Sequence, residues 1–110
     1  MNLHTAIEDT PLNQIETVTV VPAQRLDAFS APELRTDLDE LIKRGVHDFV
    51  VDLSDTDFLD SAGMAALVSL LKQARRQGGD VKLIWPRREP VQRILRLTRF
   101  DRVFEILPAA

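Results

Sequence analysis

Short apolar runs alternate along this chain with longer segments in which apolar residues recur at helical spacing. The run Ile15–Val21 is rich in β-branched residues and alternates around its threonines, which predicts a strand of a half-buried sheet that Pro22 ends. Phe49–Leu53 is almost continuously apolar and predicts a central strand buried on both faces. Two further strands are predicted at Val81–Trp85 and Val103–Leu107.

The first predicted helix follows a serine. Ser30 and Glu33 form a capping-box pair, in which each side chain would satisfy a backbone amide at the start of a helix. Leucine and isoleucine then recur at helical spacing, and Gly45 can adopt the left-handed conformation that ends many helices. We therefore predict a helix from about Ala31 to Arg44.

Two more helices are predicted in the second half of the chain. One begins at Ser61 and carries a stripe of leucine and alanine that stops at Gly78-Gly79. The other opens at Glu89-Pro90, because proline is tolerated in the first helical turn. Strands and helices therefore alternate, and crossovers of this length join parallel neighbours. The pattern predicts an α/β fold, in which helices pack against a mixed, mainly parallel central sheet.

The composition is that of one soluble globular domain, with 110 residues, 45% of them hydrophobic and 28% charged. We expect residues 1–13 to be loosely organised and residues 14–110 to form the domain. The chain contains no cysteine, so disulfides and thiolate metal sites are excluded. A signal-peptide pattern and a bilayer-spanning apolar run are both absent, which predicts a cytoplasmic protein without membrane insertion.

Charge is distributed unevenly between the two halves. Residues 1–60 carry 4 Lys and Arg against 13 Asp and Glu, whereas residues 61–110 carry 10 against 4. A basic half can bind nucleic acid, but this one has a single Trp, two Phe and no Tyr on which bases could stack. We therefore expect the basic half to form a solvated face or to meet an acidic protein, and we expect no direct nucleic-acid binding.

The segment Asp57–Leu71 (DFLDSAGMAALVSLL) places a serine at the start of the second predicted helix. Backbone amides at a helix start lack partners and the helix dipole is positive there, so a phosphate on Ser61 would be stabilised locally. Gly63 carries no Cβ and would let another backbone or a phosphate approach closely. Asp60 adjoins the hydroxyl and could orient it or take its proton. Ser61 is therefore a candidate phosphoacceptor.

Three other interpretations compete for this segment. The helix start could be no more than an N-cap, with Gly63 as a tight-packing site. A hydrolase elbow would need Gly-x-Ser-x-Gly, but position 59 is leucine, and neither His4 nor His47 stands obviously near the serine. A group of aspartates resembles a cation site, although it lacks the glycine spacing and terminal glutamate of a calcium loop: Asp52, Asp55, Asp57 and Asp60.

Several segments in order give the chain a family resemblance. A Leu-Asp pair stands at Leu26-Asp27, a strand ends in Asp-Leu within VVDLSDTDF, and Asp-Ser-x-Gly stands at Asp60–Gly63. QGGDVKLI and PVQRILRLTRFDRVFEI follow. Over about residues 15–107 the chain thus resembles the STAS-domain anti-sigma factor antagonists. It departs from them at Gln24-Arg25, because many members have glycine at the first of these two positions. It also departs at Met64, where leucine is usual.

The resemblance implies a partner-switching regulator, not an enzyme. The unphosphorylated antagonist binds an anti-sigma factor with serine kinase activity and so frees the sigma factor. The kinase then inactivates the antagonist by transferring the ATP γ-phosphate to a serine that falls on Ser61. A serine phosphatase is a further implied partner, and no cofactor of the chain itself is implied. The implied partner contacts fall on Asp27, Asp60, Ala62, Gly63 and Met64.

A second function is compatible with the same resemblance. STAS domains also serve as subunits of lipid-transport ATPase assemblies of the ABC type. There the helix after the central strand would be a permanent docking surface without phosphorylation.

Overall fold

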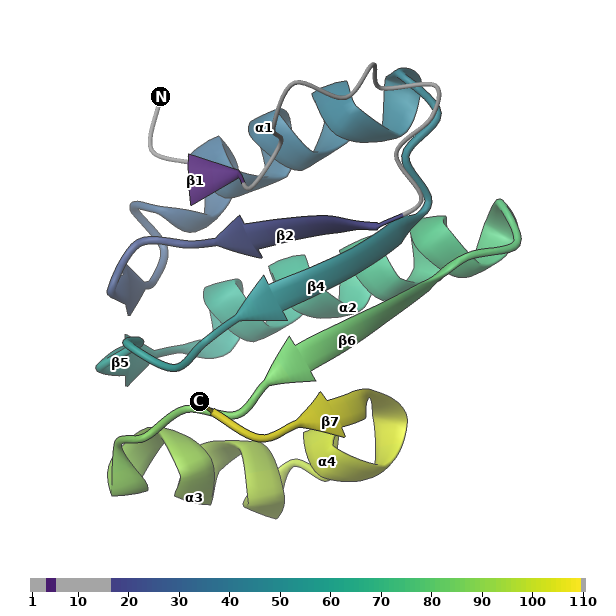
Figure 1. Ribbon diagram of the computed structural model, residues 1–110. Coiled ribbons are helices and arrows are strands. Elements are labelled where there is room, and N and C mark those ends of the chain that lie inside the picture. Colours follow the sequence, from purple (N-terminus) through teal and green to yellow (C-terminus); the bar gives the residue numbers. More distant parts are fainter. Residues whose placement is uncertain (1–3, 6–16, 110) are drawn as a thin grey trace.

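The computed structural model describes residues 4–5 and 17–109. Strands and helices alternate along the chain (Figure 1). In order they are β1 (His4–Thr5), β2 (Val18–Val21), β3 (Arg25–Leu26), α1 (Ala31–Lys43), β4 (Asp48–Asp52), β5 (Phe58–Leu59), α2 (Ser61–Arg76), β6 (Asp80–Ile84), α3 (Glu89–Leu97), α4 (Phe100–Val103) and β7 (Glu105–Leu107).

The main sheet has the strand order β1-β2-β4-β6-β7. β1 runs antiparallel to β2, and the remaining neighbours are parallel. Each parallel step is made through a helical crossover, because a tight turn cannot join parallel strands. The predicted α/β fold with a mixed, mainly parallel sheet is confirmed. Apart from β1, the segment 1–13 lies outside the described residues.

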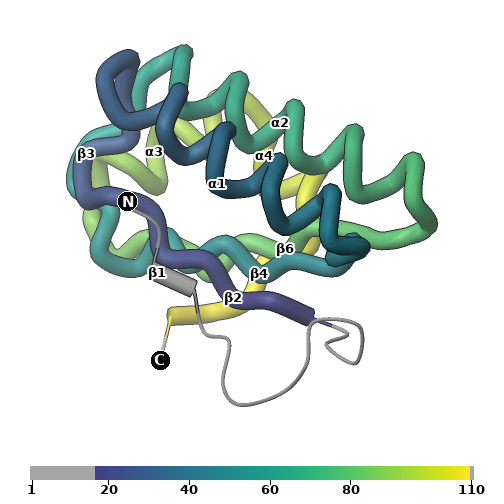
Figure 2. Tube along the Cα trace, turned by 90° about the horizontal axis from the view of Figure 1, so that it is seen from above, coloured from purple at the N-terminus to yellow at the C-terminus, as the bar shows by residue number. Residues whose placement is uncertain are grey.

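All four helices of the described chain lie on one side of the main sheet (Figure 2). In β4, Phe49 and Val51 are buried beneath these helices, whereas Val50 on the other face is only half-buried. The expectation that this strand is buried on both faces is therefore wrong. Its even-numbered positions include two aspartates, which an open face tolerates.

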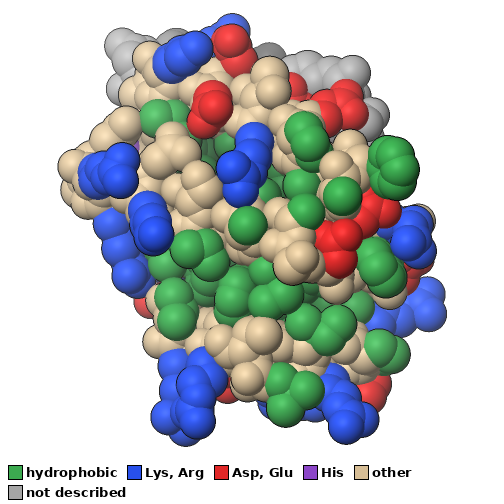
Figure 3. Space-filling model, turned by 180° about the vertical axis from the view of Figure 1, so that it is seen from behind, with side chains coloured by type: hydrophobic (Ala, Val, Ile, Leu, Met, Phe, Trp, Pro, Cys, Tyr) green, Lys and Arg blue, Asp and Glu red, His purple; other side chains and the backbone are tan. Residues whose placement is uncertain are grey.

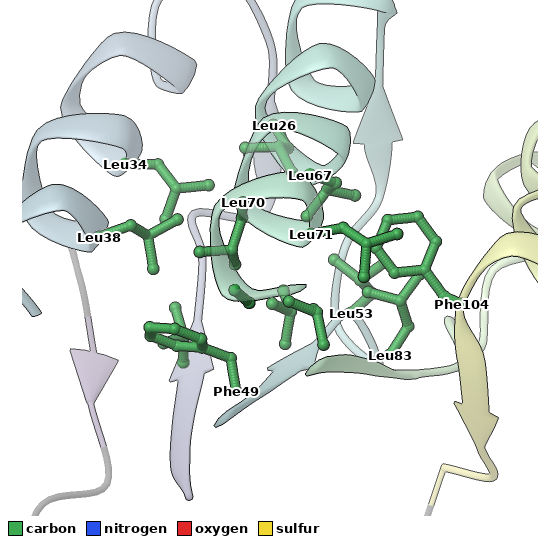
Figure 4. Packing of buried hydrophobic residues seen from close by; sticks show 14 of the residues in the cluster. Leu26, Leu34, Leu38, Phe49, Leu53, Leu67, Leu70, Leu71, Leu83 and Phe104 are labelled. Carbon is green, nitrogen blue, oxygen red and sulfur yellow. The ribbon is translucent and has the colours of Figure 1, made fainter. Parts of the chain in front are cut away.

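The core lies between the helices and the sheet (Figure 4). Leucines of α1 and α2 point toward aromatic and aliphatic side chains of the strands, and each fully buried side chain of this size contributes roughly 1.5–3 kcal/mol. The labelled members are Leu26, Leu34, Leu38, Phe49, Leu53, Leu67, Leu70, Leu71, Leu83 and Phe104. This packing holds α2 rigidly over β4 and β6.

The ends of the helices follow the sequence signals with one exception. Gly45 and Gly78 have φ values of 96° and 83°, so both occupy the left-handed region that glycine tolerates. The predicted capping box at the start of α1 is wrong, because the Ser30 hydroxyl donates to the carbonyl of Arg25 at 2.6 Å and makes no cap bond to the helix.

Four short elements were not predicted: β1, β3, β5 and α4. β3 and β5 have two residues each and form a separate parallel pair. Val103 was expected in the last strand but is the final residue of helix α4. β7 therefore begins only at Glu105. Within the described ranges, no helix combines the length and the apolar character needed to cross a bilayer.

Candidate functional site

The small sheet of β3 and β5 builds the loop region beside the start of α2. Arg25 pairs with Phe58 and Leu26 with Leu59. The two leucines are buried, while Arg25 and Phe58 are exposed and stack, with the guanidinium carbon 4.1 Å from the ring centre. The two loops thus present an outer face to solvent and an inner face to the core.

Ser61 is the first residue of α2, and it is exposed. The residue before it, Asp60, is the N-cap in an extended conformation, and its Oδ1 accepts the amide of Gly63 at 3.0 Å. Its backbone carbonyl accepts the amide of Met64 at 3.0 Å. The serine therefore stands in solvent at the positive end of a 16-residue helix.

Asp60 also joins the two loops. Its Oδ2 accepts the amide of Ala28 at 3.2 Å, and its own amide donates to the carbonyl of Leu26 at 3.3 Å. Both carboxylate oxygens are thus engaged by backbone amides. The structure favours the N-cap interpretation of Asp60 over a direct role on the Ser61 hydroxyl.

Asp27 organises the loop before α1. Its Oδ1 accepts the amides of Phe29 at 3.0 Å and Ser30 at 3.1 Å, and Arg25 lies 3.5 Å from its Oδ2. The amide of Ser30 lowers the pKa of Asp27 most, and the amide of Phe29, the charge of Arg25 and the Ser30 hydroxyl add to this, while partial burial opposes it. The turn is therefore held by an ionised carboxylate.

Gly63 is buried against β3 and β5. A Cβ added there would lie 2.8 Å from Cγ of Leu26 and 2.9 Å from Cδ1 of Leu59, and closer still to the Leu26 carbonyl oxygen. The backbone that approaches Gly63 is thus one from its own chain, as the tight-packing interpretation requires. Partner contact at Gly63 itself stays a prediction.

The other predicted contact residues lie on either side of Gly63. Ala62 is half-buried and lines a shallow hollow of about 360 Å³ between the starts of α1 and α2, together with Ala28, Ala31, Pro32, Arg35 and Ala65. Met64 is half-buried and packs against the core. Ala62 therefore shares this surface concavity with Ala28 of the loop that follows β3.

One exposed residue of this region was missed by sequence reasoning. Phe29 leaves 93% of its surface in solvent, next to the Asp27 turn. Hydrophobic side chains and acidic side chains stand side by side at this edge of the helix face, on the right of Figure 3. A signal existed in the sequence, because Phe29 lies outside every apolar repeat and follows a Leu-Asp-Ala turn.

The other candidates from the sequence are His47 and the aspartates of the possible cation site. His47 precedes β4, and its carbonyl accepts the amide of Asp80, beyond the far end of α2. The 16 residues of α2 span about 24 Å, which separates His47 from Ser61. Among the aspartates, Asp52 accepts the amide of Ser54 at 2.9 Å and Asp55 pairs with Arg87 at 3.0 Å. Within the described residues, no group of three or more such side chains could hold a metal ion.

Comparison with known proteins gives consistent results. The family pattern described as the STAS domain matches residues 9–109. A Thermotoga maritima protein assigned to the anti-sigma factor antagonists is 35% identical over 68 residues, which cover 62% of this chain and 59% of that protein. The anti-sigma-B factor antagonist of Bacillus subtilis is 38% identical over 61 residues, which cover 56% and 55%. The match thus spans less than two thirds of these curated relatives.

A structural likeness extends over almost the whole chain. The unphosphorylated form of the anti-sigma factor antagonist SpoIIAA aligns with a TM-score of 0.80 at 16% identity, covering 98% of this chain and 88% of that one. The phosphorylated form of SpoIIAA aligns with a TM-score of 0.74. At this identity the likeness shows a shared fold.

Proposed function

This chain belongs to the STAS-domain family, and we propose that it is an anti-sigma factor antagonist that phosphorylation of Ser61 switches off. In its unphosphorylated form it binds an anti-sigma factor with serine kinase activity. That partner uses ATP to phosphorylate it, and a serine phosphatase restores the binding form. The chain acts as a regulator and kinase substrate, in the cytoplasm where sigma factors work.

The observation that carries this proposal is the exposed Ser61 at the first position of α2. A kinase must bring the hydroxyl oxygen in line with the γ-phosphate of ATP, so the acceptor has to stand clear of the domain. The capped helix start fixes the backbone that carries the hydroxyl. The helix dipole favours the product, since it stabilises negative charge at this end.

Phosphorylation would change recognition without changing the fold. A phosphate adds about −1.5 to −2 charges at neutral pH. It would join the carboxylates of Asp27, Asp57 and Asp60 beside the hollow, whose lining is apolar apart from Arg35. A partner that packs closely on this surface would have to strip water from the new dianion, and binding would weaken.

The test uses the histidine-kinase-like anti-sigma factors of the organism that encodes this chain. Each is incubated with the protein and ATP, and the modified residue is located by mass spectrometry. Phosphate is expected on Ser61 and lost in Ser61→Ala. Ser69→Ala is the matched control, because Ser69 lies half-buried on the same helix, and it should be phosphorylated normally.

Two results would contradict the proposal. Phosphate on a residue other than Ser61 would remove the assigned switch. A complete lack of phosphorylation and binding with every candidate kinase would instead favour the permanent docking subunit of a lipid-transport assembly.

A further inference from the structure

We propose that Phe29 is the anchor residue by which this chain holds its anti-sigma factor kinase, an inference that rests on the proposed function. Its phenyl ring would enter an apolar pocket on the kinase. In return, an apolar side chain of the kinase would occupy the hollow lined by Ala28, Ala31, Pro32, Ala62 and Ala65 and by Arg35. The contact would surround Ser61 from two sides.

The exposure of Phe29 is the first support. A phenylalanine with 93% of its surface in water loses the free energy that burial of its ring would give, and it adds nothing to the core. Single exposed apolar residues are common, so exposure alone decides nothing. What sets Phe29 apart is the rigidity of the backbone that carries it.

Hydrogen bonds fix the backbone on each side of the ring. The amide of Phe29 and that of Ser30 both donate to Oδ1 of Asp27, and the amide of Ala28 donates to Oδ2 of Asp60. The Ser30 hydroxyl closes the turn by donating to the Arg25 carbonyl at 2.6 Å. A side chain presented from such a turn loses little conformational entropy on binding, which is what an anchor residue needs.

The position of Phe29 identifies its partner. Ala28 and Asp60 are joined at 3.2 Å, and their next neighbours in sequence are Phe29 and Ser61. A protein that covers the Ser61 hydroxyl to transfer a phosphoryl group would therefore meet the neighbouring Phe29 turn. The kinase is thus the protein that would contact both Phe29 and Ser61.

Charge argues against a second copy of this chain as the occupant. The same edge carries Asp27, Asp57 and Asp60, of which Asp27 is paired with Arg25. Two copies docked through this edge would bring these carboxylates together, and like charges across an interface oppose association. Arg35 lines the hollow, Glu33 stands in the first turn of α1, and Arg87 is paired with Asp55.

The proposal also explains how phosphorylation would release the kinase. Phe29, Ala62 and Ala65 would contribute the apolar part of the contact around Ser61. A phosphate carried into it would lose its hydration and would be held next to Asp60, so the closely packed complex would open. Phe29 and the phosphorylated Ser61 would then act on the same binding surface.

The test measures the dissociation constant of the kinase complex by titration calorimetry, together with the KM and kcat of Ser61 phosphorylation. Phe29→Ala should weaken binding roughly 30-fold, as a truncated anchor does, and raise KM similarly while kcat changes little. Leu97→Ala is the matched control, because Leu97 is 74% exposed at the C-terminal end of α3, and its affinity should stay within about twofold. Ala65→Gln, which fills the hollow, should also weaken binding.

The possible outcomes separate this inference from the proposed function. If the wild type binds the kinase and Phe29→Ala binds it with the same affinity, the anchor role of Phe29 is overturned. The proposed phosphorylation of Ser61 is then unaffected. A dimer of the wild-type chain that Phe29→Ala abolishes, seen by sedimentation equilibrium, would make a second copy the occupant and overturn the inference. Failure of the wild-type chain to bind any candidate kinase would overturn the proposed function itself.

Discussion

The carboxylate of Asp60 bonds the amide of Ala28, which lies 32 residues earlier in the chain, at a distance of 3.2 Å. Its other oxygen caps α2 by accepting the amide of Gly63 at 3.0 Å. One side chain therefore fixes the start of the helix that bears Ser61 and the loop that bears Phe29. The geometry of the candidate surface depends on this double acceptor.

Two substitutions of Asp60 should destabilise the protein to different extents. Asp60→Ala removes both acceptors and should lower the free energy of unfolding by about 1–2 kcal/mol, the usual effect of losing an N-cap. Asp60→Asn keeps one acceptor oxygen and should lose less. Urea denaturation measures both values. An Asp60→Asn variant as stable as the wild type would show that the second acceptor, which bonds Ala28 or Gly63, contributes nothing, and losses equal to those of Asp60→Ala would show that the retained oxygen contributes nothing.

Gly63→Ala should destabilise the protein although alanine is the better helix former. At an open helical position this change would raise the free energy of unfolding by up to about 1 kcal/mol. Here the new methyl group meets the Leu26 carbonyl and the Leu59 side chain, and overpacking of this kind costs about 1–3 kcal/mol. A net loss by chemical denaturation is expected, and a gain would contradict the close packing of α2 on β3.

The stabilisation by the Asp27 carboxylate should depend on pH. Because folding lowers the pKa of Asp27 from 3.8, its charge stabilises the fold above about pH 4 and ceases to do so as the pH falls through the lowered value. Asp27→Asn retains an oxygen that can accept the amides of Phe29 and Ser30 but carries no charge. The wild type should therefore be more stable than this variant at pH 6.

The pH series provides the control for Asp27. The difference in free energy of unfolding between the two proteins should shrink as the pH drops below 3.8, since other titrating groups are common to both. Urea denaturation at several pH values measures it. A difference that grows on acidification would be incompatible with a lowered pKa.

Ser61→Asp should separate binding from stability. A negative charge at the first helical position is favourable to the dipole, so we expect a loss of less than about 1 kcal/mol in the free energy of unfolding. Binding to the kinase should nevertheless weaken, while the neutral Ser61→Asn should weaken it less. Calorimetry and thermal unfolding measure the two effects, and a large drop in the melting temperature of Ser61→Asp would contradict this prediction.

The sequence predicted the larger elements because their signals are local. The leucine stripe of α2 and the left-handed Gly78 at its end are read from neighbouring residues alone. The Asp-Ser-x-Gly segment likewise gave the candidate phosphoacceptor. Its exposure could not be read from the sequence, because exposure depends on which other segments cover the helix start.

The unpredicted features depend on contacts between distant residues. β3 and β5 have two residues each, too few for any periodicity, and they exist because Leu26 and Leu59 pair beneath Gly63. The Ser30 capping box failed because the neighbouring Asp27 carboxylate accepts the local amides and the serine hydroxyl is drawn to the Arg25 carbonyl. The open face of β4 also could not be inferred from an apolar run alone.

The alternation in β3 and β5 has a consequence for substitutions at the outer surface. Inward leucines secure the backbone, while Arg25 and Phe58 on the outer side contribute nothing to the interior. Substitution of Phe58 should therefore alter the outer surface beside α2 and leave the hydrophobic interior untouched. Substitution of Arg25 would also remove its ion pair with Asp27.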